Sequence, residues 1–268
     1  MSADTNKKIE VGVSVACGYP EYPEVTLKRL LELGVRHVEI FLNTHSETKQ
    51  EYVRELKKMM DDYGCTCKSV HPFTAAIDTY MLYTPYERRI QDFLDYHRRY
   101  FEAMDILGAE YLILHGNQDK GPDEVVIEGY RRLNSVAKEY GKIVLQENVY
   151  RCTTGALEQL VAMKKALGDE VSFVLDTKQA VRRGYDPYDF IKELSPNIKH
   201  IHYSDHDANS TCILPDKGEI NTPRFIQALK EVGFSGSIML ELYRSSFGTF
   251  EELVESMKYV QSVVETIL

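Results

Sequence analysis

The sequence predicts a single (β/α)8 TIM barrel, an α/β fold, that spans residues 1–268. Short β-branched segments alternate strictly with longer segments of helical periodicity, and there are eight of each. Strands that alternate with helices form parallel βαβ units, and eight such units in a chain of 268 residues are typical of this barrel. A doubly wound open sheet ranks second, because the segment SVACGYP after the first strand contains no G-x-G-x-x-G phosphate-binding motif.

The expected strands are short runs rich in valine, isoleucine and leucine, as buried parallel strands are. Most of them pass from apolar residues into ionisable ones at their C-terminal end. In chain order they cover residues 9–16, 37–42, 65–73, 111–117, 142–149, 171–178, 198–205 and 237–243.

The expected helices carry apolar residues three and four positions apart, and many of them end at a glycine that can adopt the left-handed C-cap conformation. These glycines are Gly34, Gly64, Gly108, Gly141, Gly168 and Gly233. The helices cover residues 26–34, 47–64, 86–108, 122–141, 156–168, 186–195, 222–233 and 249–268. In the third of them, aromatic residues at helical spacing are expected to face the core, and His97 is expected to be structural or on the surface.

The composition of the chain limits the partners and the cellular compartment that we expect for the protein. The net charge of −9, from 32 Lys and Arg against 41 Asp and Glu, disfavours a nucleic-acid partner, because phosphate neutralisation supplies most non-specific affinity for nucleic acids. The sequence contains no apolar run of about 18 residues, so we expect no membrane span. The five cysteines are odd in number and scattered, which favours reduced thiols and a cytoplasmic protein.

Ionisable residues gather at the predicted C-terminal ends of the strands, where barrels of this class place their active sites. Three carboxylates from neighbouring strands would repel one another unless a cation lay between them. We therefore expect a divalent metal site, which suits Mn²⁺, Co²⁺ or Mg²⁺, with Zn²⁺ as an alternative. Its expected ligands are Glu147, Asp176, His202 and Glu241. His200, two residues before His202, is expected deeper in the barrel. The alternative to a ligand role is an N-cap of the following turn for Asp176 and an ion pair with a nearby lysine for Glu147.

Several segments of the chain resemble the xylose-isomerase-like TIM-barrel superfamily, which includes sugar (phosphate) isomerases and epimerases, inosose dehydratases and endonuclease IV. The resemblance covers nearly the whole chain and is strongest at VLQENVY, FVLDTKQA, IKHIHYSD and LPDKGEINTPRFIQALKEVGFSGSIMLELY. It implies the same four metal ligands. The sequence departs from ketose 3-epimerases at Gln179, where they often have histidine. It departs from endonuclease IV at Ser210 and Cys212, where a D-x-H pair is expected.

The resemblance implies a sugar or sugar-phosphate isomerase or epimerase that transfers a proton at the carbon next to a carbonyl, through a metal-stabilised enediolate. Glu147 and Glu241 are expected to be both ligands and proton carriers. The expected substrate contacts are His71, His115, Lys178, Gln179 and Arg244, the last at a position where barrels often bind phosphate. An inosose-type dehydratase is the alternative, followed by an abasic-site endonuclease and a non-catalytic sugar-binding subunit. The superfamily implies a homo-oligomer.

Overall fold

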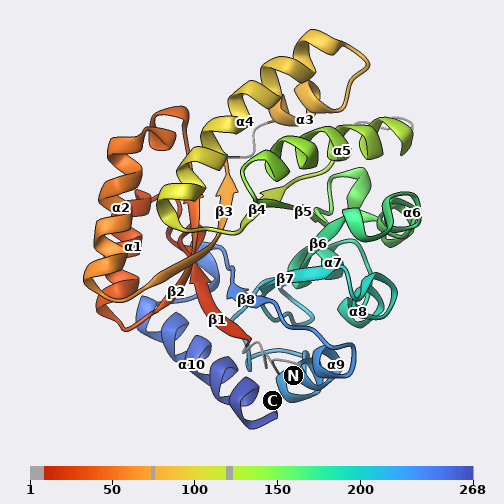
Figure 1. Ribbon diagram of the computed structural model, residues 1–268. Helices are drawn as coiled ribbons and strands as arrows, with labels where there is room; N and C mark the ends of the chain where they lie inside the picture. The colour runs from red at the N-terminus through yellow and green to blue at the C-terminus, as the bar shows by residue number, and fades with distance from the viewer. Residues whose placement is uncertain (1–8, 74–75, 119–122, 268) are drawn as a thin grey trace, which may run out of the picture.

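The strands form a closed parallel barrel in the order β1 to β8, so the predicted fold is confirmed. The structure is a computed structural model that describes residues 9–73, 76–118 and 123–267. Figure 1 shows the strands at the centre of the molecule and the helices around them. The strands are β1 (Glu10–Ser14), β2 (His37–Leu42), β3 (Thr66–Pro72), β4 (Tyr111–Leu114), β5 (Ile143–Glu147), β6 (Ser172–Asp176), β7 (Ile198–Tyr203) and β8 (Ser237–Leu240).

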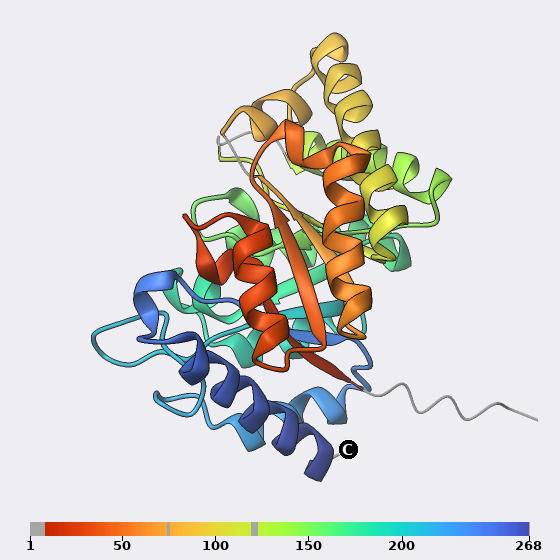
Figure 2. The ribbon, with the colours of Figure 1, turned by 90° about the vertical axis from the view of Figure 1, so that its left-hand side faces the viewer.

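All eight expected helices are present and cover the outside of the barrel; α1 and α2 lie side by side over β2 (Figure 2). They are α1 (Pro23–Glu32), α2 (Gln50–Asp62), α4 (Glu87–Leu107), α5 (Asp123–Glu139), α6 (Leu157–Leu167), α8 (Pro187–Leu194), α9 (Thr222–Glu231) and α10 (Phe250–Ile267). The expected ends at Pro122 and Leu268 lie outside the described residues. Among the described helices, none combines the length and apolarity that crossing a membrane requires.

Local sequence explains where these helices end. The six glycines expected at C-termini all have positive φ, from +57° at Gly168 to +96° at Gly34. A residue with a Cβ would be strained in that conformation, whereas glycine adopts it at little cost. These glycines therefore mark the helix ends through their backbone conformation, and the helices end within a few residues of them, as expected.

Two further helices were not expected, namely α3 (Ala76–Leu82) and α7 (Thr177–Arg182). The second corrects the strand predicted over 171–178, because β6 ends at Asp176 and α7 begins at the next residue. The Asp176 side chain accepts a hydrogen bond from the backbone N–H of Gln179 at 3.0 Å, which is an N-cap. This turn brings Lys178 and Gln179 to the mouth of the barrel.

The apolar core lies between barrel and helices, where side chains such as Leu27, Phe101 and Phe225 are fully buried. All five cysteines are buried and free of disulfides. His97 is also buried: its Nδ1 lies 2.9 Å from the carbonyl oxygen of Phe93, and its ring stacks on the Phe93 ring at 3.8 Å. His97 is thus a core residue of α4.

Candidate active site

The structure brings the four expected metal ligands together at the C-terminal mouth of the barrel. Glu147 ends β5, Asp176 ends β6, His202 lies near the end of β7, and Glu241 follows β8. Each residue offers one donor atom, and these atoms all lie within 4.8 Å of one another. The register of the sheet accounts for part of this, because Asp176 is paired with His202 across β6 and β7.

His202 lies at the centre of the cluster. Its Nδ1 is 2.9 Å from Glu241 Oε2, 3.3 Å from Glu147 Oε1 and 3.9 Å from Asp176 Oδ2. His202, Glu147 and Asp176 are at most 1% exposed. Glu147, at the end of β5, and Glu241, directly after β8, thus approach the same nitrogen from different parts of the barrel mouth.

The backbone at Asp176 is held in place by Asn148, which follows β5. The Asn148 side chain accepts a hydrogen bond from the N–H of Asp176 at 2.7 Å and donates one to its carbonyl oxygen at 3.0 Å. Because Asp176 Oδ1 caps α7, Oδ2 is the oxygen left to face the cluster. The N-cap interpretation and the ligand interpretation of Asp176 are thus compatible.

His71 and His115 both approach Glu147. The Nε2 atoms of His115 and His71 lie 2.7 and 3.8 Å from Glu147 Oε2. The other ring nitrogen of His71, Nδ1, is 2.9 Å from the carbonyl oxygen of Pro72. The ion pair with a lysine that was considered for Glu147 is replaced by contacts with three histidines, the third being His202.

Lys178 and Gln179 also reach the cluster. The Lys178 ammonium forms ion pairs with Asp176 Oδ2 and, at 2.9 Å, with Glu241 Oε2. Gln179 accepts a hydrogen bond from the backbone N–H of Tyr150 at 3.2 Å. Both side chains line the cavity described below.

Arg244 is not brought into the site. Its guanidinium donates hydrogen bonds to the carbonyl oxygens of Phe247 at 3.0 Å and Gly248 at 3.2 Å, and it lies over the rings of Phe247 and Phe250. The structure thus uses this cation to brace the loop after β8. It gives no support to the expected contact between Arg244 and a substrate phosphate.

Sequence analysis missed Glu39, a fully buried carboxylate in β2. Glu39 Oε2 is 3.1 Å from His202 Nε2, and it accepts a hydrogen bond from Ser69 at 2.8 Å. It also lies 3.4 Å from His200 Nε2, while His200 Nδ1 is 2.7 Å from Ser237. The available signal was an acidic residue between Val38 and Ile40 in an otherwise apolar strand. Glu39 orients His202, since a carboxylate on one ring nitrogen directs the other toward a metal position.

Burial and charge act together on the pKa values in this cluster. Burial raises the pKa of Asp176 to about 7; Lys178 opposes the rise, while Glu241 and Glu147 add to it. Burial lowers the pKa of His202, but the charges of Glu241 and Glu39 outweigh it and raise the pKa well above its usual value. Burial is thus the main cause of the raised pKa of Asp176, and the neighbouring carboxylates add to it.

The cluster borders a cavity of about 320 Å³. Its lining combines Glu147 and Glu241 of the cluster with aromatic side chains. Those aromatic residues are Tyr19, Phe41, Phe73 and Tyr243. A small ring with polar edges and apolar faces would match such a cavity.

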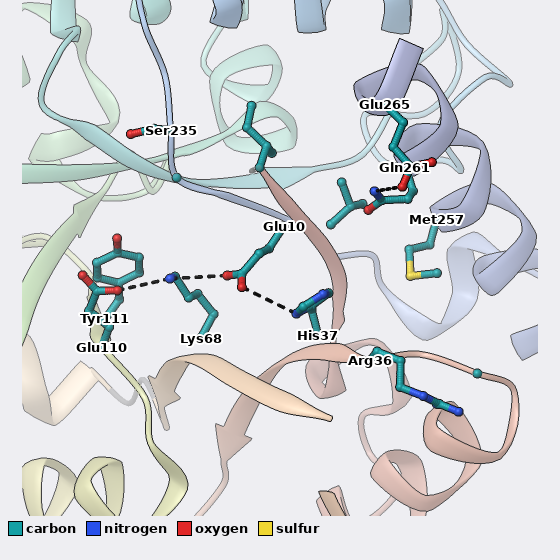
Figure 3. A pocket seen from close by; sticks show the side chains of 14 residues that line it. Glu10, Arg36, His37, Lys68, Glu110, Tyr111, Ser235, Met257, Gln261 and Glu265 are labelled. Atoms are coloured by element: carbon teal, nitrogen blue, oxygen red, sulfur yellow. Dashed lines mark hydrogen bonds and ion pairs between the residues drawn. The ribbon is translucent and has the colours of Figure 1, made fainter. Parts of the chain in front are cut away.

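A larger cavity, of about 610 Å³, lies at the opposite end of the barrel (Figure 3). There Lys68 forms ion pairs with Glu10 at 3.3 Å and Glu110 at 3.1 Å, and His37 lies 3.9 Å from Glu10. These charged groups pair with one another, in contrast to the excess of carboxylates at the C-terminal mouth. We therefore place the candidate active site at the smaller cavity.

The donor set fits a divalent cation. Three carboxylates and one imidazole at these separations form the mixed oxygen and nitrogen set that Mn²⁺, Co²⁺, Mg²⁺ or Zn²⁺ accepts. Burial raises the pKa of Asp176 most and the charges of Glu241 and Glu147 add to the rise, so a cation at this position would favour the ionised carboxylate.

Comparison with known proteins gives the family. The fold and the cluster define a TIM barrel with a polar site at the C-terminal ends of its strands. Residues 27–263 match the model of the xylose isomerase-like TIM barrel family, so the chain belongs to that family.

Two relatives by sequence are enzymes of inosose chemistry by name. Inosose isomerase of Halalkalibacterium halodurans is 28% identical over 138 residues, which cover 47% of this chain and only 49% of that protein. Inosose dehydratase of Bacillus anthracis is 23% identical over 253 residues, which cover 85% of this chain and 80% of that protein.

Solved structures agree on the fold. A D-tagatose 3-epimerase-like protein has a TM-score of 0.79 at 19% identity, with 97% of this chain and 98% of that chain covered. The IOLI protein with a bound zinc atom has a TM-score of 0.75 at 18% identity, with 96% of this chain and 99% of that chain covered.

Proposed function

We propose that this protein is a divalent-metal-dependent sugar isomerase or epimerase that moves a proton at the carbon next to a carbonyl group. The observation that carries the proposal is the convergence of Glu147, Asp176, His202 and Glu241 beside a cavity of sugar size. The names of the inosose and ketose enzymes related to this chain support the substrate class.

The two glutamates are the proposed proton carriers. A divalent cation held by the four residues would supply positive charge that stabilises an oxyanion on the sugar. Glu147 ends β5, Glu241 directly follows β8, and both contact His202, so each can face a different side of a ring in the cavity. One carboxylate takes the proton from carbon, and the other returns a proton to the opposite face or to the neighbouring carbon.

His115 and His71 are the proposed partners of Glu147 in this step. Their Nε2 atoms lie on the Oε2 side of Glu147, so they can hold its charge and donate hydrogen bonds to sugar hydroxyls. Burial lowers the pKa of His71, but Glu147 and Glu39 outweigh it and the net pKa is raised. His71 is thereby favoured as a cationic donor.

We infer that the substrate is a neutral sugar. Lys178 is the single Lys or Arg among the residues that line the cavity, and two carboxylates already pair with it. Arg244 is engaged by backbone carbonyls, and the histidines of the described cavity lining, His71 and His115, face Glu147, so the described lining offers no unpaired Lys or Arg for a phosphate group. The free keto-sugars and inososes are therefore the first compounds to assay.

The proposal is tested by exchange of substrate C–H protons in deuterated water, across a panel of ketoses and inososes. We expect exchange with Mn²⁺ or Co²⁺, loss of exchange after chelation, and loss in Glu241→Gln or Glu147→Gln protein. Glu219→Gln is the matched control, because this exposed glutamate lies outside the cluster and should be dispensable. Exchange that survives both chelation and Glu241→Gln would refute the proposal.

A dehydratase is the second candidate, since a relative bears that name and an elimination begins with the same proton removal. The two candidates differ in the product. A dehydratase releases a compound lighter by one water molecule, whereas an isomerase or epimerase conserves the mass, so mass spectrometry of the products separates them.

A further inference from the structure

The Lys178 ammonium lies inside the candidate metal site. Its side chain is 4% exposed, and Nζ contacts Asp176 Oδ2 and Glu241 Oε2. These are the same two oxygens that face His202 Nδ1, at 3.9 and 2.9 Å. The lysine and a divalent ion held by this cluster would therefore use the same oxygen atoms.

The local fold fixes the backbone of Lys178 but allows its ammonium group to move. Asp176 caps α7, and Thr177 donates a hydrogen bond to the carbonyl oxygen of Ser204 at 2.8 Å while accepting one from the Ser204 N–H at 3.0 Å. The backbone of the first turn of α7 is thus tied to β6 and to the end of β7. Beyond it, the four-carbon stem of lysine allows Nζ to move while Cα stays in place.

The charge balance explains why an ammonium is tolerated there. Three buried carboxylates, Glu39, Glu147 and Asp176, and the partly buried Glu241 meet around His202. Removing a carboxylate from water is costly unless a cation compensates. Lys178 supplies one positive charge to Asp176 and Glu241, whereas His71 and His115 face Glu147.

We propose that Lys178 is a built-in counter-cation that competes with the divalent metal for Asp176 Oδ2 and Glu241 Oε2. On this proposal, metal binding moves the ammonium off these oxygens into the adjoining cavity, where it contacts a substrate oxygen. The inference rests on the proposed function, because it assumes that the cluster binds a metal. Lys178 would then set the metal affinity of this chain and position its substrate.

The test compares Mn²⁺ binding by calorimetry in the wild-type chain and in Lys178→Met. Removal of a competing charge from the site should tighten Mn²⁺ binding by about 10-fold or more. It should also lower the melting temperature of the metal-free protein and increase the rise that Mn²⁺ produces. At saturating Mn²⁺, KM for the keto-sugar should rise more than kcat falls.

Lys68→Met is the matched control. Lys68 also bridges two carboxylates, Glu10 and Glu110, but at the other end of the barrel (Figure 3). This variant should leave the Mn²⁺ affinity unchanged. A change common to both variants would assign the effect to net charge and would overturn the proposal.

The remaining outcomes are also decisive. A folded Lys178→Met protein that binds Mn²⁺ no tighter than wild type overturns the competition, and an unchanged KM overturns the substrate contact. If the variant folds only with metal, release of Mn²⁺ to excess chelator is measured instead: slower release than wild type supports competition, and equal or faster release overturns it. A wild-type protein that binds no Mn²⁺, Co²⁺, Mg²⁺ or Zn²⁺ overturns the proposed metal centre together with this inference, which separates the two failures.

Discussion

Replacing Glu39 with glutamine tests whether this buried carboxylate tunes the metal centre through His202. In the wild-type chain, Glu39 Oε2 is 3.1 Å from His202 Nε2, and Nδ1 of the same ring faces the other three expected ligands. Glutamine keeps the shape and an acceptor oxygen but loses the charge. A hydrogen bond to a charged acceptor is worth about 1 to 1.5 kcal/mol more than one between neutral groups.

That difference corresponds to about a 10-fold change in an equilibrium constant, which agrees with the 10- to 100-fold losses typical when the carboxylate behind a metal-bound histidine is changed. We therefore expect Glu39→Gln to bind Mn²⁺ about 10-fold more weakly, as measured by calorimetry. Ser69→Ala is the control, because it removes the Ser69 hydrogen bond to Glu39 Oε2 and leaves the contact of Glu39 with His202 intact. Folded Glu39→Gln protein with wild-type Mn²⁺ affinity would refute the idea that Glu39 acts on the metal through His202.

Two further predictions concern residues outside the cluster. Burial lowers the pKa of His97 to about 4, against about 6.5 in the unfolded chain, so the unfolded state binds more protons between these values and stability falls as the pH falls. We expect the free energy of unfolding, measured with urea, to fall by up to about 3 kcal/mol between pH 6.5 and 4, and to fall less in His97→Phe. The same dependence of unfolding free energy on pH in both proteins would contradict this. Arg244→Ala should leave KM for a neutral keto-sugar unchanged in steady-state kinetics, whereas a marked rise would return Arg244 to the substrate site.

Sequence reasoning succeeded where a residue type has one dominant physical role. Glycines in the left-handed conformation ended the helices, and the alternation of strand and helix gave the barrel. Once the barrel is given, the ends of neighbouring parallel strands must meet at one rim, so Glu147, Asp176, His202 and Glu241 were brought together as expected. Their roles as ligands and proton carriers remain predictions.

Sequence reasoning missed three features of the structure, each for a different physical reason. Glu39 and His202 are 163 positions apart, and the sequence around Glu39 does not reveal which histidine faces it. Arg244 was expected to be free for phosphate, yet nearby carbonyl groups engage it, because the path of the loop after β8 decides what a long cation reaches. The break between β6 and α7 was missed because Asp176 reads equally well as the end of a strand and as an N-cap.

Asp176 connects these observations, since one carboxylate serves the fold and the site at once. Its Oδ1 caps α7 and thereby fixes Lys178 and Gln179 at the mouth, while Oδ2 faces His202 and takes the Lys178 ammonium. Asp176→Ala should therefore disturb both functions, because alanine has no side-chain oxygen to cap α7, whereas Glu241→Ala changes a residue that caps no helix among the described residues. If the cluster is a metal centre, both variants should lose Mn²⁺ affinity. In metal-free protein, Asp176→Ala should lower the melting temperature more than Glu241→Ala, and the reverse order would show that the cap contributes little.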